Sequence, residues 1–233
     1  MNHIIAVEGF GGYPFWQKRI PRKMETKKDL LYGVGPSQVF NFVVPLFAFR
    51  PDCDWSYYPQ FMVWPIIGKI RSLRKIKKPE DRIILIGFSY GGSAVHAVSH
   101  RFSETIFDLV ISLDPVGKWR WNVAPDDPRT YRFRKPNSVK RWVNLYQRID
   151  RCSFAPGHPW LTRPIWGGKV DGADRETELL PDDFQFEHIY NDGTTTHGFP
   201  EVRDFAEFSE QAHRWFPAHN EVLHQITSEL ERL

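Results

Sequence analysis

A serine flanked by glycines two residues away on either side is the strongest chemical signal in the sequence. Residues 83–92 read IILIGFSYGG, so Ser89 lies between Gly87 and Gly91. The apolar residues before the motif predict a buried strand, and the small residues after it predict a helix. A serine at such a turn has a strained backbone that directs its hydroxyl out of the sheet, near the positive end of the helix. The motif therefore predicts a nucleophile; the simpler interpretation is a glycine turn with a capping serine.

A nucleophilic serine needs a base to take its proton and an acid to orient that base. Asp114 follows the apolar residues 109–113, which we expect to form the strand after the helix, so a parallel sheet would bring it to the edge where Ser89 lies. Asp150, at the end of the next expected strand, is the alternative acid. We favour Asp114 because Asp150 lies beside Arg151, an arrangement typical of a surface ion pair, although Asp114 could also simply cap its own turn.

Nine histidines compete for the role of the base, and His197 is the best placed in the sequence. It lies in the polar residues 191–200, which we interpret as a loop between the last strand and a helix in the tail. Gly198 permits a close turn there. His188 alternates with phenylalanines on the expected strand 184–190, which favours a structural role. The simpler interpretation of His197 is an exposed loop histidine.

The order Ser89, Asp114, His197 resembles the catalytic triad of the α/β-hydrolase superfamily, in its lipase-like branch. Residues 113–115, Leu-Asp-Pro, are similar to the residues around the acid of pancreatic-type lipases. The resemblance implies an α/β-hydrolase fold: a mostly parallel central sheet with helices on both faces and long loops over the catalytic edge. It also implies a serine hydrolase of the esterase or lipase type that cleaves carboxylic esters through a covalent acyl-enzyme, without a cofactor.

A glycine-rich segment near the start of the sequence extends this resemblance. Residues 8–12, EGFGG, resemble the His-Gly-Phe-Gly loop whose backbone supplies half of the oxyanion hole in such enzymes. The implied donors are the backbone N–H groups of Phe10 and of Tyr90, the residue after the nucleophile. Glu8 departs from the pattern, because the family usually has histidine at this position. It places a carboxylate near the site.

Aromatic and basic residues suggest the class of substrate. Trp119, Trp121 and Trp160 lie on expected loops near the catalytic edge, where they could line an acyl pocket, stack on sugar rings or simply anchor the loops. Residues 1–150 carry 24 Lys and Arg against 13 Asp and Glu, whereas residues 151–233 carry 7 against 15. Basic clusters at 69–78 and 129–141 favour either solvated faces or a rim that attracts an anionic substrate. We expect a small-molecule, lipid or glycan ester, and nucleic acid is disfavoured because no nucleic-acid motif is present.

The elements that would position these residues form one domain, residues 1–233, of the α/β class. With 41% apolar and 15% aromatic residues, the chain supplies one core. Two long segments, 11–37 and 151–181, resist assignment and are candidate lid or cap loops. Short apolar runs separated by amphipathic stretches predict the remaining elements: strands at 3–8, 39–49, 82–86, 109–113, 141–147 and 184–190, and helices from Pro65, at 93–102 and from Pro200.

Several classes of protein are disfavoured. No apolar run reaches the ~18 residues that a membrane span needs, and no signal peptide is visible, so we expect a cytoplasmic protein. Two cysteines cannot build a disulfide framework, and neither a phosphate loop nor a metal-ligand cluster is present, so no cofactor is expected. Two alternatives stay open: an acyltransferase with the same triad, and a non-catalytic binding module that uses the basic residues.

Overall fold

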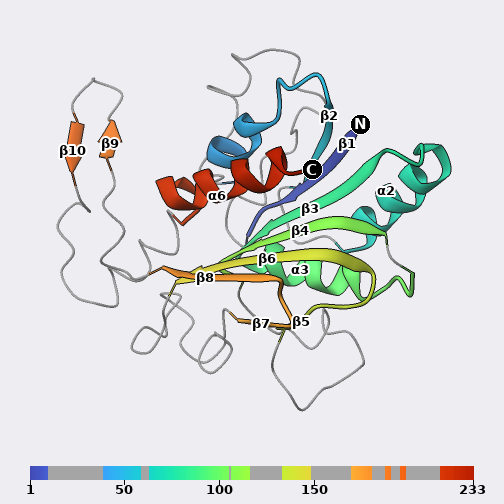
Figure 1. Ribbon diagram of the computed structural model, residues 1–233. Helices are drawn as coiled ribbons and strands as arrows, with labels where there is room; N and C mark the ends of the chain where they lie inside the picture. The colour runs from blue at the N-terminus through green and yellow to red at the C-terminus, as the bar shows by residue number, and fades with distance from the viewer. Residues whose placement is uncertain are drawn as a thin grey trace, which may run out of the picture.

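The structure is a computed structural model, and it describes residues 1–9, 39–58, 63–104, 106–115, 133–147, 169–179, 187–189, 195–197 and 216–233. Its centre is a six-stranded sheet in the order β2-β1-β3-β4-β6-β8, in which all neighbouring strands are parallel (Figure 1). The strands are β1 (Asn2–Val7), β2 (Cys53–Tyr58), β3 (Arg82–Phe88), β4 (Phe107–Leu113), β6 (Val139–Gln147) and β8 (Arg175–Leu179).

Helices cover both faces of this sheet. On one face lie α2 (Val63–Ile76) and α3 (Tyr90–Ser99); on the other lie α6 (Asn220–Glu231) and the short helices η1 (Val39–Val43), η2 (Val44–Leu46) and η4 (Phe216–Ala218). The central strands are apolar on both sides because both faces are covered. Ile4 and Ala6 of β1 pack toward α6, whereas Ile5 and Val7 pack toward α2 and α3. The structure thus confirms an α/β architecture.

Two small sheets complete the described elements. One pairs β5 (Phe133–Arg134) with β7 (Val170–Asp171) in parallel. The other pairs β9 (Glu187–Ile189) with β10 (Thr195–His197) in antiparallel orientation. Figure 1 shows β9 and β10 set apart from the six-stranded sheet.

The strand order creates one topological switch point. From β1 the chain passes to β2 on one side, and it then returns to place β3 on the other side of β1. The two connections leave in opposite directions, and in open α/β sheets ligands bind beyond the carboxyl ends of the strands at such a point. The candidate nucleophile directly follows the carboxyl end of β3.

Most predicted elements are confirmed, with shifted ends, but one prediction is wrong. Residues 39–46 form η1 and η2 rather than a strand. An apolar run of this length does not distinguish a buried helix from a strand by periodicity, and Pro45 is tolerated in the first turn of η2. Two edge strands were not predicted, β2 and β8; β8 lies inside the unassigned segment 151–181. Residues 11–37 and 151–168 lie outside the described residues, as do residues 200–215, the first part of the helical tail expected from Pro200.

Within the described part of the chain, no helix is both long and apolar enough to cross a membrane.

Candidate active site

Ser89 occupies the junction between β3 and α3 in a strained backbone conformation. Its φ of 55° and ψ of −121° lie in a region that non-glycine residues rarely adopt. Such a conformation costs on the order of 1–3 kcal/mol and persists only where the surroundings enforce it. The Ser89 backbone N–H donates to the carbonyl oxygen of Leu113 over 3.0 Å, which fixes the turn to the end of β4. Ser89 itself is buried.

The two glycines of the motif are required by close packing around this turn. A Cβ atom at Gly87 would lie 2.4 Å from the carbonyl oxygen of Gly91, and a Cβ at Gly91 would lie 2.3 Å from the carbonyl oxygen of Val7. Both distances are far below van der Waals contact, so neither position accepts a side chain. The G-x-S-x-G spacing therefore reflects the approach of β1, β3 and the first turn of α3 to one another.

Asp114 lies at the neighbouring strand end. Phe88 and Leu113 are in register, so Ser89 and Asp114 are the residues that directly follow two paired strands. Asp114 is completely buried, has a φ of 40°, and donates its backbone N–H to the Leu145 carbonyl over 2.7 Å. Among the described residues, only Ser89 and Asp114 combine a side chain with a positive φ. The strained positions thus meet at one edge, where the strand pattern predicted them to meet.

The loop after β1 packs directly against Ser89. A Cβ atom at Gly9 would lie 2.6 Å from the Cβ of Ser89 and 3.2 Å from its Oγ. The backbone at Gly9 is therefore in contact with the serine side chain. Tyr90 begins α3 immediately behind it, whereas Phe10 lies outside the described residues.

Glu8 anchors this loop, a role that the sequence did not reveal. Its side chain is buried, with one oxygen accepting from the Val39 N–H over 2.9 Å and from the Tyr57 hydroxyl over 3.3 Å. The other oxygen accepts from the Gly9 N–H over 3.2 Å. Glu8 thus links β1 to η1 and β2. These partners are 31 and 49 residues away along the chain, and so no local pattern indicates them.

His197 is not brought together with Ser89 and Asp114. It lies in strand β10 rather than in the expected loop, and it pairs with Glu187 of β9 in a separate two-stranded sheet. Thr196 pairs with His188 in the same ladder. The remaining residues that sequence analysis singled out lie outside the described part of the chain: Asp150, Trp119, Trp121 and Trp160.

Two of the other histidines have structural contacts. His96 accepts the backbone N–H of Arg134 over 3.0 Å, and His100 lies 2.8 Å from the Arg134 carbonyl oxygen. Their ring centroids are 4.3 Å apart, so together they hold β5 against the end of α3.

Of the basic cluster 129–141 expected at the catalytic edge, residues 129–132 lie outside the described residues, and the described part lies elsewhere. Residues 133–141 lead into the start of β6, at the amino edge of the sheet, because the chain must return to that edge before a further parallel strand can begin. Three of the four cations described there are engaged with acids: Lys135 with Asp174, Lys140 with Asp108 and Arg141 with Glu229. This part of the segment does not form a positive rim over Ser89.

No group of three or more His, Cys, Asp or Glu residues that could hold a metal ion occurs in the described ranges. Comparison of the sequence with family models gave no match, and searches of curated proteins and of solved structures gave none either.

Proposed function

We propose that the protein is a serine hydrolase of the α/β-hydrolase fold that cleaves carboxylic esters, with Ser89, His197 and Asp114 as nucleophile, base and acid. The strained Ser89 backbone, with Gly9 packed against the side chain, carries the proposal. Strain of this kind clusters at active sites, where it holds a reacting group in place. Nucleophile and acid also follow adjacent strands beside the switch point.

In the proposed reaction, the Ser89 Oγ attacks the carbonyl carbon of the ester while His197 takes the hydroxyl proton. This step requires β10 to lie against the Ser89 edge of the sheet, closer than it is drawn in Figure 1. The negative charge that develops on the carbonyl oxygen is stabilised by the backbone N–H groups of Tyr90 and Phe10. The intermediate then expels the alcohol, which receives the proton from His197, and leaves an acyl group on Ser89. Water attacks this acyl-enzyme by the same route and releases the carboxylic acid.

Covalent labelling tests the nucleophile. A fluorophosphonate should add one label to the folded protein, on the peptide that contains Ser89. Ser89→Ala should lower kcat on a short-chain ester by about 10⁴–10⁶-fold. Ser72→Ala, which changes an exposed serine on α2, is the control and should leave labelling and turnover intact. A label on another residue, or none on folded protein, would contradict the proposal and favour a non-catalytic binding module.

Paired substitutions test the base and the acid. His197→Ala and Asp114→Asn should each abolish most turnover, whereas His188→Ala and Asp150→Asn should not. Activity should fall on the acid side of the pH profile, because a protonated histidine cannot act as the base. If His188→Ala is more damaging than His197→Ala, His188 is the base. If Asp150→Asn is more damaging than Asp114→Asn, Asp150 is the acid.

A further inference from the structure

Helix α2 carries an unusual concentration of positive charge. Residues 63–78 contain six Lys and Arg and no Asp or Glu. One side of the helix, formed by Ile66, Ile67, Ile70 and Leu73, is buried against the sheet. Trp64, Arg71 and Lys75 follow one another at intervals of seven and four residues, so they lie along the opposite side of the helix. Arg71 and Lys75 are both exposed, and Lys78 follows just beyond the helix. We refer to Trp64, Arg71, Lys75, Ile76, Lys78 and Arg101 as the α2 surface.

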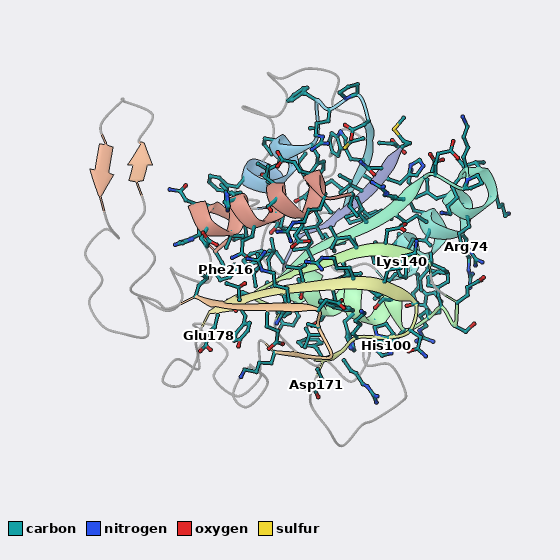
Figure 2. The ribbon with its side chains drawn as sticks, viewed as in Figure 1. Arg74, His100, Lys140, Asp171, Glu178 and Phe216 are labelled. Carbon is teal, nitrogen blue, oxygen red and sulfur yellow. The ribbon has the colours of Figure 1, made fainter. Side chains whose placement is uncertain are left out.

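Few of these cations are neutralised within the described structure. Arg74, at the far end of α2 in Figure 2, pairs with Glu104, and Lys77 donates to the backbone carbonyl of Asp81. No described acid lies within ion-pair distance of Arg71, Lys75 or Lys78. This differs from residues 133–141, where most of the described cations have an acidic partner. The α2 surface therefore projects positive charge into solvent.

Two large apolar side chains are exposed at the two ends of α2, on either side of these cations along the chain. Trp64 is 68% exposed at the start of α2, and Ile76 is 74% exposed at its end. The guanidinium of Arg101, from the end of α3, lies 5.6 Å from the centroid of the Trp64 ring. Exposed tryptophan beside Lys and Arg is typical of surfaces that lie at the boundary between lipid headgroups and acyl chains.

We propose that the α2 surface binds to membranes that contain anionic phospholipids, and that it holds the protein at the bilayer. The cations would contact the headgroup phosphates and carboxylates, while Trp64 and Ile76 would enter the interfacial layer. Nucleic acid fits less well. It offers no apolar layer for Ile76, and Arg101 covers one face of the Trp64 ring on which a base would stack. Lys78 lies just before the start of β3, whereas Ser89 directly follows the end of that strand. The proposal does not rest on the proposed function.

Vesicle co-sedimentation of the full chain tests this inference. The probes are phosphatidylcholine vesicles, alone or with roughly one lipid in three replaced by phosphatidylserine. We expect binding only to the anionic vesicles, and weaker binding at high salt. The triple variant Arg71→Gln, Lys75→Gln, Lys78→Gln should lower partitioning about a hundredfold, because each cation near an anionic bilayer contributes roughly a factor of five. Trp64→Ser should also weaken binding.

A matched triple variant controls for net charge. Arg50→Gln, Lys140→Gln, Lys169→Gln removes the same number of positive charges outside α2, and it should bind anionic vesicles like the unmodified protein. Equal losses in both triple variants would overturn the proposal, as would equal binding to neutral and anionic vesicles or binding to neither. Salt-sensitive retention of DNA through Arg71, Lys75 and Lys78, without vesicle binding, would also overturn it and assign the surface to nucleic acid.

Discussion

At the scale of single residues, the contact between Gly9 and Ser89 gives a sharp prediction. Gly9→Ala places a methyl carbon 2.6 Å from the Ser89 Cβ, so the loop or the elbow must move. We expect a fall of more than tenfold in the rate of fluorophosphonate labelling and a loss of about 1–3 kcal/mol in the free energy of unfolding, as for other overpacked sites. Labelling kinetics and urea unfolding measure the two effects.

Gly68→Ala is the matched control for this change. A Cβ atom at Gly68 has no neighbour within 4 Å, and the position lies in the interior of α2. Alanine should therefore stabilise the protein by about 0.5–1 kcal/mol through its helix propensity, with labelling unchanged. Equal effects of the two substitutions would show that the close approach at Gly9 has no bearing on the serine.

Glu8 gives a second prediction at this scale, because its carboxylate accepts from three donors at once. Glu8→Gln preserves the volume but turns an amide donor toward at least one N–H or hydroxyl, which costs about 1–3 kcal/mol. As a positioning residue, Glu8 should affect kcat more than KM on a short ester. Tyr57→Phe, which removes one of the three donors, should have a smaller effect. A Glu8→Gln variant with unchanged kcat would limit Glu8 to a structural role.

At the scale of elements, α6 is held to the sheet by a buried carboxylate. Glu229 accepts from Arg141 of β6 over 2.7 and 2.9 Å and from Arg232 over 3.1 Å, and Arg175 of β8 lies 3.5 Å away. The hydrogen bonds from Arg141 are the main cause that lowers the pKa of Glu229 below its ordinary value of 4.5. Glu229 is therefore charged in the folded protein and links the tail of the chain to two strands.

The lowered pKa determines how this link responds to pH. The unfolded chain binds the proton more readily than the folded protein, so the contribution of Glu229 to stability is complete above pH 4.5 and is lost as the pH falls further. Glu229→Gln should cost about 1–3 kcal/mol at neutral pH, because the arginines stay partly hydrated. Urea unfolding should show this difference shrinking below pH 4.5. A difference that is constant with pH would exclude the ionic contribution.

The secondary-structure elements differ in how strongly the local sequence indicates them. The strands β1, β3 and β4 are continuous apolar runs buried on both faces, and the pattern identified them. Strand β8, Arg-Glu-Thr-Glu-Leu, lies at the sheet edge, and its alternating exposure leaves little apolar signal. Ser89 and Asp114 were predicted because local motifs carry them. The contacts of Glu8 and Gly9 were not, because they join residues that are far apart in the chain.

At the scale of the whole molecule, the described part of the second basic cluster lies away from the candidate active site. The described cations of residues 133–141 lie at the amino edge of the sheet and are mostly ion-paired. Arg134→Ser should therefore leave kcat/KM unchanged for both an anionic and a neutral ester. Measurements at low and at physiological ionic strength, where steering by exposed charges differs most, provide the check. A selective loss for the anionic ester at low salt would place this arginine on the path of the substrate.

The all-parallel pairing of the central sheet has a consequence for how the chain folds. Strand β1 is flanked by β2 and β3, whose residues follow it by about 50 and 80 positions. Synthesis at about 5–20 residues per second separates β1 from β3 by roughly 4–16 s. The Ile-Ile-Ala-Val stretch has neither neighbour until β2 is made, roughly 2.5–10 s later, and it lacks β3 for the whole interval. Its unpaired edge is exposed to pairing with other chains during this time. Slower synthesis, a lower temperature or a chaperone that covers this stretch should raise the yield of correctly folded protein.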